Sequence, residues 1–126
     1  MKEKNNLNII NGSNNMRVLL ESPYAADTEE GLERNINYAR ECMRDCFMRG
    51  EFPFASHLLY TQDGILDDNI PNERTLGINA GLDWGKLAEK TVVYTDLGVG
   101  KGMVYGIKRA IDDCRPIEYR MIYKDD

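Results

Sequence analysis

The chain has 126 residues, of which 42% are hydrophobic and 29% charged, and its formal net charge is −5 at pH 7. This size and composition predict one globular domain that folds without disulfides or metal. The negative charge argues against a protein that wraps duplex DNA or an anionic membrane surface. No apolar run reaches the length of a membrane span, and the first 15 residues contain no apolar signal segment, so we expect no membrane association and no leader.

The three cysteines and the single histidine do not form a metal-binding pattern. Cys42, Cys46 and Cys114 lack a Cys-x-x-Cys pair, and His57 is the one imidazole. A structural zinc site needs four such ligands, so we expect no metal. Cys42 and Cys46 lie four residues apart in a predicted helix, which is typical of small packing residues in a reducing cytoplasm.

Residues 1–15 differ from the rest of the chain. They are rich in asparagine, and Leu7–Ile10 holds most of their few apolar residues. We interpret this segment as a flexible N-terminal arm, with an edge strand at Leu7–Ile10 as the alternative. Residues 16–126 are then the single α/β domain.

The first predicted strand is Arg17–Glu21, and Pro23 ends it. A helix of about 20 residues follows and stops at Gly50. Asp27 and Glu30 form a better capping box for this helix than Thr28 and Gly31. The apolar residues that recur at helical spacing, and are expected to face the core, are Leu32, Ile36, Ala39, Met43 and Phe47.

The remaining elements alternate between strand and helix. A strand at 52–55 leads to Ser56 and His57, and a long polar loop at 60–72 precedes a helix at 71–86. A strand at 91–95, a helix at 103–114 and a strand at 117–123 complete the chain. This order predicts an α/β fold, a Rossmann-like three-layer domain with a mainly parallel sheet.

In such a fold, ligands bind beyond the carboxyl ends of the strands. Here those ends carry 22–25, 56–58 and 96–103. Gly98, Gly100 and Gly102 separate the third strand from a helix whose free N–H groups suit a phosphate. The spacing matches neither a Walker loop nor a dinucleotide fingerprint, so a simple tight turn is the alternative.

Other candidates in these segments each allow a structural role. His57 is either a ligand contact or a hydrogen-bonded structural histidine. Asp96 either caps the following turn or binds a ribose or base. Tyr24 and Trp84 either stack on a ring or belong to the core.

Taken together, three motifs resemble the nucleoside 2-deoxyribosyltransferase-like superfamily: Ser22-Pro23-Tyr24, Ala55-Ser56-His57-Leu58-Leu59, and Asp96-Leu97-Gly98 with Lys101-Gly102-Met103. Within it, the chain is most similar to the first family of phage Thoeris anti-defence proteins. That resemblance implies a Rossmann-like fold and a homo-oligomer, a dimer or hexamer. It also implies binding of glycocyclic ADP-ribose isomers without cleavage, a second site for cyclic oligonucleotides at subunit junctions, and a location in the cytoplasm of the infected bacterial host.

One departure from the related enzymes concerns their nucleophilic glutamate. The superfamily pattern Ser-Glu-Gly-Met-x-x-Glu, aligned with 100–106, puts Gly106 at the glutamate position, and no acidic residue occurs between Leu97 and Ile111. We therefore expect a binding protein and not an enzyme. The alternatives are an N-ribosyl hydrolase or transferase that uses another chain's carboxylate, and an interaction module with a vestigial pocket.

The resulting hypothesis is a sponge that sequesters a cyclic ADP-ribose-type signal, with no cofactor and no catalytic residue. The amides of 98–103 and Lys101 would hold the pyrophosphate, Asp96 and Ser22 the ribose hydroxyls, and Tyr24 and Leu58 the adenine. Arg109 is the candidate for a second anionic site at an interface. The predicted ligand-binding set is Ser22, Pro23, Tyr24, Ala25, His57, Leu58, Asp96, Gly98, Gly100, Lys101, Gly102, Met103 and Arg109.

Overall fold

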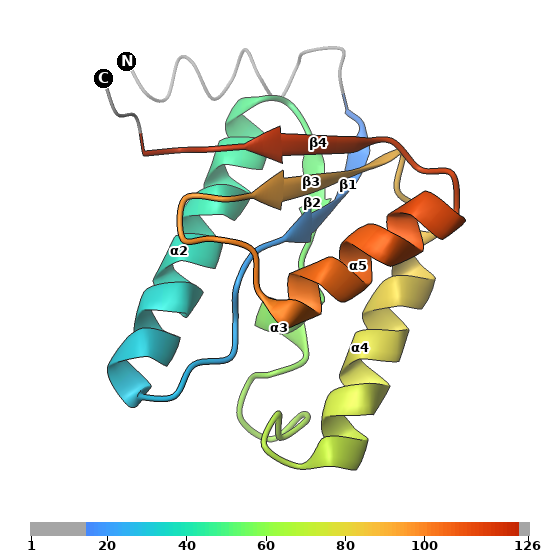
Figure 1. Cartoon of the computed structure of the whole chain (residues 1–126). Helices are drawn as coiled ribbons and strands as arrows, with labels where there is room; N and C mark the ends of the chain where they lie inside the picture. The colour runs from blue at the N-terminus through green and yellow to red at the C-terminus, as the bar shows by residue number, and fades with distance from the viewer. Residues whose placement is uncertain (1–14, 124–126) are drawn as a thin grey trace.

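The computed structural model describes residues 15–123 and contains a four-stranded sheet (Figure 1). All of its strands are parallel, in the order β2-β1-β3-β4. They are β1 (Arg17–Glu21), β2 (Phe52–Phe54), β3 (Lys90–Tyr94) and β4 (Ile117–Arg120). The predicted α/β class is confirmed. The proposed N-terminal arm and its alternative strand lie almost entirely outside the described residues.

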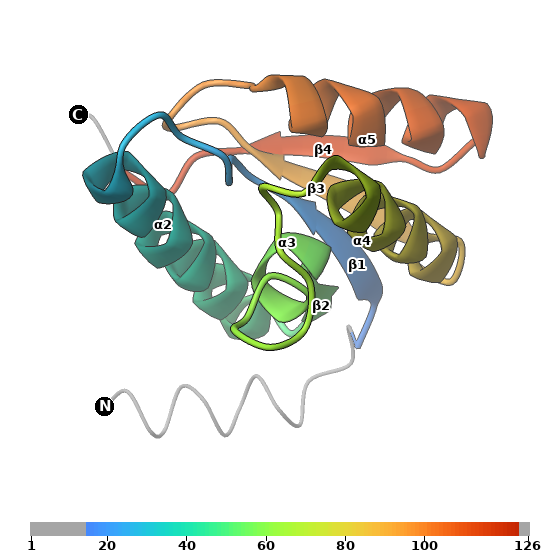
Figure 2. The same cartoon turned by 90° about the horizontal axis from the view of Figure 1, so that it is seen from below.

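Helices cover both faces of the sheet, which gives the three layers. Helix α2 (Glu29–Met48) lies on one face, and α4 (Pro71–Gly85) and α5 (Lys101–Asp112) lie on the other (Figure 2). A short helix, α3 (Ser56–Leu59), follows β2 directly. The sequence did not predict α3, because a single turn is too short to show helical periodicity.

The main core lies between the sheet and α2. Val18 and Leu20 from β1 and Val92 and Tyr94 from β3 point to this face and pack against α2. Since strand side chains alternate, Leu19 and Glu21 point to the opposite face, toward α4 and α5. This alternation decides which residues reach the functional site.

Two predictions about α2 were wrong. Its N-cap is Thr28, whose hydroxyl accepts the N–H of Gly31 at 3.0 Å, and not Asp27. The buried face was also misplaced, because Phe47 at the end of the predicted stripe is 47% exposed. The residues that α2 buries are Asn35, Tyr38, Ala39, Cys42 and Cys46.

The last two elements are displaced from their predicted bounds. Helix α5 begins at Lys101, two residues before Met103, because Gly100 serves as its N-cap. Strand β4 ends at Arg120 and not at Tyr123, because the N–H groups of Ile122 and Tyr123 donate to Asp96 instead of a neighbouring strand.

A buried ion pair crosses from β4 to the start of β2. Arg120 Nη2 lies 2.6 Å from Glu51 Oε2, and both side chains are 2% exposed. Arg120 also donates to the Tyr94 hydroxyl at 2.9 Å, and Lys90 approaches Glu51 at 3.4 Å. Such a pair is costly to leave half-complete, since a single buried charge remains.

No helix among residues 15–123 is long and apolar enough to cross a membrane. In the same range, no three His, Cys, Asp or Glu side chains lie close enough together to hold a metal ion.

Candidate functional site

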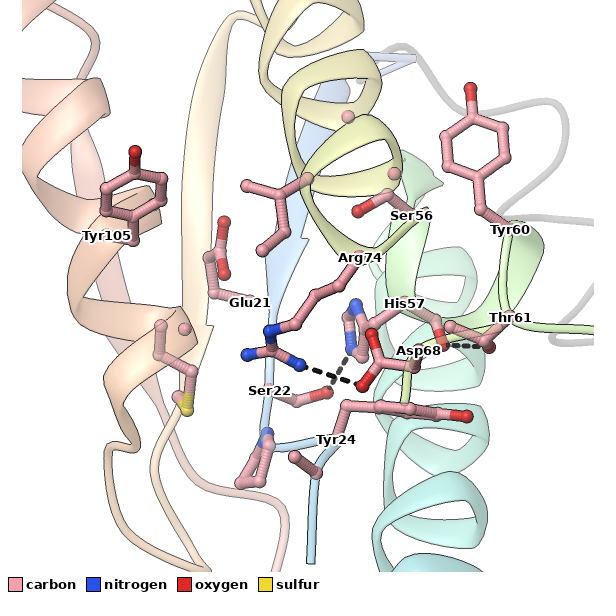
Figure 3. A pocket seen from close by; sticks show the side chains of 18 of the residues that line it. Glu21, Ser22, Tyr24, Ser56, His57, Tyr60, Thr61, Asp68, Arg74 and Tyr105 are labelled. Atoms are coloured by element: carbon pink, nitrogen blue, oxygen red, sulfur yellow. Dashed lines mark hydrogen bonds and ion pairs between the residues drawn. The ribbon is translucent and has the colours of Figure 1, made fainter. Parts of the chain in front are cut away.

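A pocket opens beyond the carboxyl end of β1, between α3, α4 and the start of α5 (Figure 3). The loop after β1 forms one wall, and the loop between α3 and α4 contributes Tyr60, Thr61, Leu66 and Asp68. Among the predicted site residues, nine line this pocket: Ser22, Pro23, Tyr24, Ala25, His57, Gly100, Lys101, Gly102 and Met103. Segments that are distant in the sequence thus meet beyond the carboxyl ends of the strands, which is where the sequence predicted a binding site.

Four predicted residues do not line this pocket. Leu58 packs against the core under α2, and Gly98 lies in the preceding turn with a φ of +91°. Arg109 lies in the last turn of α5, where it pairs with Asp113 at 3.3 Å. Trp84 was a stacking candidate but not a member of the predicted set; it is 53% exposed on α4 and also lies outside the pocket lining.

Asp96 is the fourth, and its carboxylate is already engaged elsewhere. It accepts the Tyr38 hydroxyl at 2.7 Å and the N–H groups of Ile122 and Tyr123 at 2.9 Å each. These hydrogen bonds lower the pKa of Asp96 although burial opposes them. The structure therefore places Asp96 as a structural anchor for the segment after β4, and not beside Ser22.

Ser22 and His57 form a hydrogen bond in the pocket wall. Ser22 Oγ lies 2.7 Å from His57 Nε2, joining the end of β1 to α3 (Figure 3). Burial lowers the pKa of His57 to about 4, so the ring is neutral at pH 7. Within the described chain the bond to Ser22 is the one hydrogen bond of the His57 ring. The pair fixes the Ser22 hydroxyl in place.

The mouth of the pocket is cationic. Lys101 begins α5, and its N-cap, Gly100, has no side chain to accept the first N–H groups of the helix; the Met103 sulfur accepts the N–H of Gly100 itself at 3.4 Å. Arg74 of α4 points across the pocket toward Gly102, where a Cβ would lie 4.0 Å from its Nη2. Arg74 Nη1 pairs with Asp68 at 2.8 Å, which holds the guanidinium over the opening. Asp68 offsets part of the Arg74 charge, so Lys101 and the helix dipole are the main attraction for an anionic group, and the second guanidinium nitrogen of Arg74 can add a hydrogen bond.

Glu21 lies at the inner end of the pocket, against α5. The position of a Cβ on Gly106 would be 2.5 Å from Glu21 Cδ, so any other residue at 106 would force this carboxyl to move. Burial between the helices raises the pKa of Glu21 to about 8, and the Arg115 charge offsets only part of that rise. Glu21 is therefore mostly a neutral acid at pH 7.

The Gly106→Ala substitution is expected to lower the free energy of unfolding by about 1–2 kcal/mol through overpacking against Glu21. In a Glu21→Ala background the same substitution should leave the free energy of unfolding unchanged or raise it, because alanine has a higher helix propensity than glycine. A double-mutant cycle by urea denaturation measures this coupling. Additive effects would mean that the two residues do not meet. A Gly106→Glu substitution has still less room and is not expected to create turnover.

The sequence did not indicate Glu21 or Arg74 as site residues, and Ser56, although part of a recognised motif, was not in the predicted ligand-binding set. The sequence did contain an indication for Glu21. In a strand that is buried on both faces, a charged side chain must point into one of the helical layers or into a cavity. Ser56 begins α3, and a Cβ on Gly81 would lie 2.5 Å from its Oγ, so a glycine again makes space for a polar side chain. Arg74 gives no signal, because an arginine in a polar helix segment is ordinarily solvated.

The chain has the fold of the nucleoside 2-deoxyribosyltransferases. It is similar to the solved 2-deoxyribosyltransferase from the psychrotolerant bacterium Bacillus psychrosaccharolyticus, with a TM-score of 0.58 and 19% identity over 87% of this chain and 75% of that one. Residues 16–120 match the family described as Domain of unknown function (DUF7768), and the chain belongs to that family. A search of the curated proteins found no match.

Proposed function

We propose that this pocket binds a phosphate-bearing nucleotide and holds it without cleavage. The observation that carries the proposal is the cationic mouth, where Lys101, Arg74 and the uncapped start of α5 converge beyond a parallel strand. The pyrophosphate lies at this mouth, and Tyr24 and Tyr60 in the walls offer rings to a base. The resemblance to the Thoeris anti-defence proteins supports a cyclic ADP-ribose isomer as the ligand and sequestration in an infected bacterial cytoplasm as the role.

The absence of cleavage is supported by the state of the carboxyl at the inner end. A nucleophilic carboxylate must be ionised, and burial keeps Glu21 mostly protonated at neutral pH. The other acids at the pocket are engaged, since Asp68 pairs with Arg74 and Glu73 accepts the N–H of Asp67 at 2.7 Å. No described residue thus supplies the ionised, positioned carboxylate that glycosidic cleavage needs.

A second candidate, an N-ribosyl hydrolase, is favoured by one observation. Glu21 fills the space beside Gly106, so the required carboxyl can come from this same chain and not from a neighbouring subunit. A hydrolase that attacks through Glu21 would gain rate as the pH rises through about 8, where this group ionises. A nucleotide that stays intact at both pH 7 and pH 9 excludes this candidate.

The Lys101→Glu substitution is expected to weaken binding of cyclic ADP-ribose by about 2 kcal/mol or more, roughly 30-fold, because it reverses a charge beside the pyrophosphate. Stability should hardly change, since Lys101 is exposed and a glutamate suits the first turn of a helix. Isothermal titration calorimetry measures the effect. Lys108→Glu, an equal charge change on an exposed residue of α5 outside the pocket, is the matched control. Equal affinities of the two variants would place the phosphates elsewhere.

We also propose that the protein is a homo-oligomer. Strand β4 is at an edge of the sheet, and the segment around it exposes large apolar side chains: Tyr119, Met121 and Tyr123 are 59%, 58% and 48% exposed. Sedimentation at micromolar concentration is expected to give a mass above that of one chain. Tyr119→Glu should reduce that mass, and a wild-type monomer would contradict the expectation.

A further inference from the structure

The inner end of the pocket contains a carboxyl group without a partner. No described residue donates a hydrogen bond or an ion pair to Glu21, and its side chain is only half-buried. Glu21 is one of the residues that line the pocket, and Figure 3 shows its side chain between α4 and α5. Gly106 makes room for the carboxyl itself, which lies against this glycine of α5. An unpaired polar group in such a place costs free energy, so its retention needs an explanation.

The walls around this carboxyl are largely apolar. Leu19 comes from β1, Ile78 and Leu82 from α4, and Met103 from α5. The one cation that acts on Glu21 is Arg115, whose Nε is bound to Thr91 Oγ1 at 2.9 Å. The other titratable or charged groups of the pocket are His57 on α3, Asp68 in the loop, Glu73 and Arg74 on α4, and Lys101 and Tyr105 on α5, besides Tyr24 and Tyr60.

We propose that the Glu21 carboxyl, in the pocket wall beside Gly106, forms an inner subsite for an uncharged ligand group that both donates and accepts hydrogen bonds, such as a pair of sugar hydroxyls or a nucleobase edge. A protonated carboxyl offers one donor and one acceptor side by side, which complements such a group. An anionic group placed there would lose its water without gaining a counter-charge. This subsite deepens the proposed function and rests on it, since it orients a ligand whose anionic end lies at the cationic mouth.

The raised pKa of Glu21 gives the subsite a pH dependence. Below about pH 8 the carboxyl is neutral and donates a hydrogen bond. Above that pH the carboxylate has no proton to donate, and covering it with a ligand costs the free energy of removing its water. Binding of a neutral ligand is therefore expected to weaken as the pH rises through 8. In Glu21→Gln the amide keeps a donor and an acceptor at every pH, so this dependence should vanish.

The test uses adenosine, which is uncharged from pH 6.5 to 9.5, and calorimetric or NMR titration of the full chain. For the wild type we expect affinity to fall about fivefold or more across that range, a change of about 1 kcal/mol. Glu21→Gln should change less than about twofold, and Glu21→Leu should bind about tenfold more weakly than the wild type at pH 6.5. Glu33→Gln, an exposed carboxyl on α2, is the control and should follow the wild type.

Inorganic pyrophosphate, titrated in parallel, separates this inference from the proposed function. If pyrophosphate binds, and adenosine binds equally well to the wild type and to Glu21→Leu, the inner subsite is overturned and the cationic mouth is supported. Adenosine binding that depends on Glu21 without pyrophosphate binding would support the subsite and overturn the anionic mouth. Binding of neither probe would overturn both.

Discussion

Arg120→Ala is expected to lower the free energy of unfolding by about 3 kcal/mol or more, because it removes both hydrogen bonds of the guanidinium to buried Glu51 and leaves Lys90, 3.4 Å away, as the remaining cation. Arg120 and Glu51 are each 2% exposed and meet in two hydrogen bonds, at 2.9 and 2.6 Å. Arg120 also donates to the Tyr94 hydroxyl under α2, so its loss disturbs the core as well. Chemical denaturation of the purified variant measures the change.

The double variant Glu51→Gln/Arg120→Met distinguishes the effect of an unpaired buried charge from the effect of lost side-chain packing. It removes both charges and keeps much of the side-chain volume, so it should be clearly more stable than Arg120→Ala. Arg109→Ala is the matched control, because Arg109 pairs with Asp113 at the surface, where such pairs contribute about 0–1 kcal/mol. A loss below 1 kcal/mol for Arg120→Ala would contradict the buried pair.

Glu21→Gln is expected to be more stable than the wild type at neutral pH, by on the order of 3 kcal/mol near pH 7.5. The sign follows from the two states of the acid. In the unfolded chain Glu21 ionises near pH 4.5, whereas in the folded protein its pKa is about 8. The wild type therefore loses stability as the pH rises from about 4.5 to 8. The glutamine variant does not, since its amide does not titrate.

Urea denaturation of both proteins across this pH range tests the prediction. The stability difference between variant and wild type should be small near pH 4.5 and should grow steadily to about pH 8. Other titrating groups, among them His57, contribute equally to both proteins and cancel in the difference. A pH-independent difference would contradict the raised pKa.

The sequence predicted the sheet and most of the pocket because both depend on local patterns. Apolar runs at 17–21 and 91–95 identify β1 and β3, and the polar residues after them mark the carboxyl edge. Fold and strand ends were therefore accessible without coordinates. The structural similarity to a 2-deoxyribosyltransferase agrees with that prediction of the fold.

The sequence did not show toward which face of the sheet each side chain points. Alternation puts Asp96 on the same side as Val92 and Tyr94, facing α2, and puts Glu21 with Leu19 on the side of α4 and α5. The sequence cannot assign these faces until the crossovers are placed. For that reason Asp96 was assigned to the site, and Glu21, which lies in it, was not.

The most direct test of the proposed function is recovery of the ligand. Cyclic ADP-ribose isomers are incubated for a day with stoichiometric wild-type protein at pH 7 and pH 9, the protein is denatured, and the released ligand is identified by chromatography and mass spectrometry. We predict retention of the ligand by the native protein and complete recovery of the intact cyclic species at both pH values. Free base or linear ADP-ribose, formed by the wild type and absent with Glu21→Gln, would identify a hydrolase and contradict sequestration.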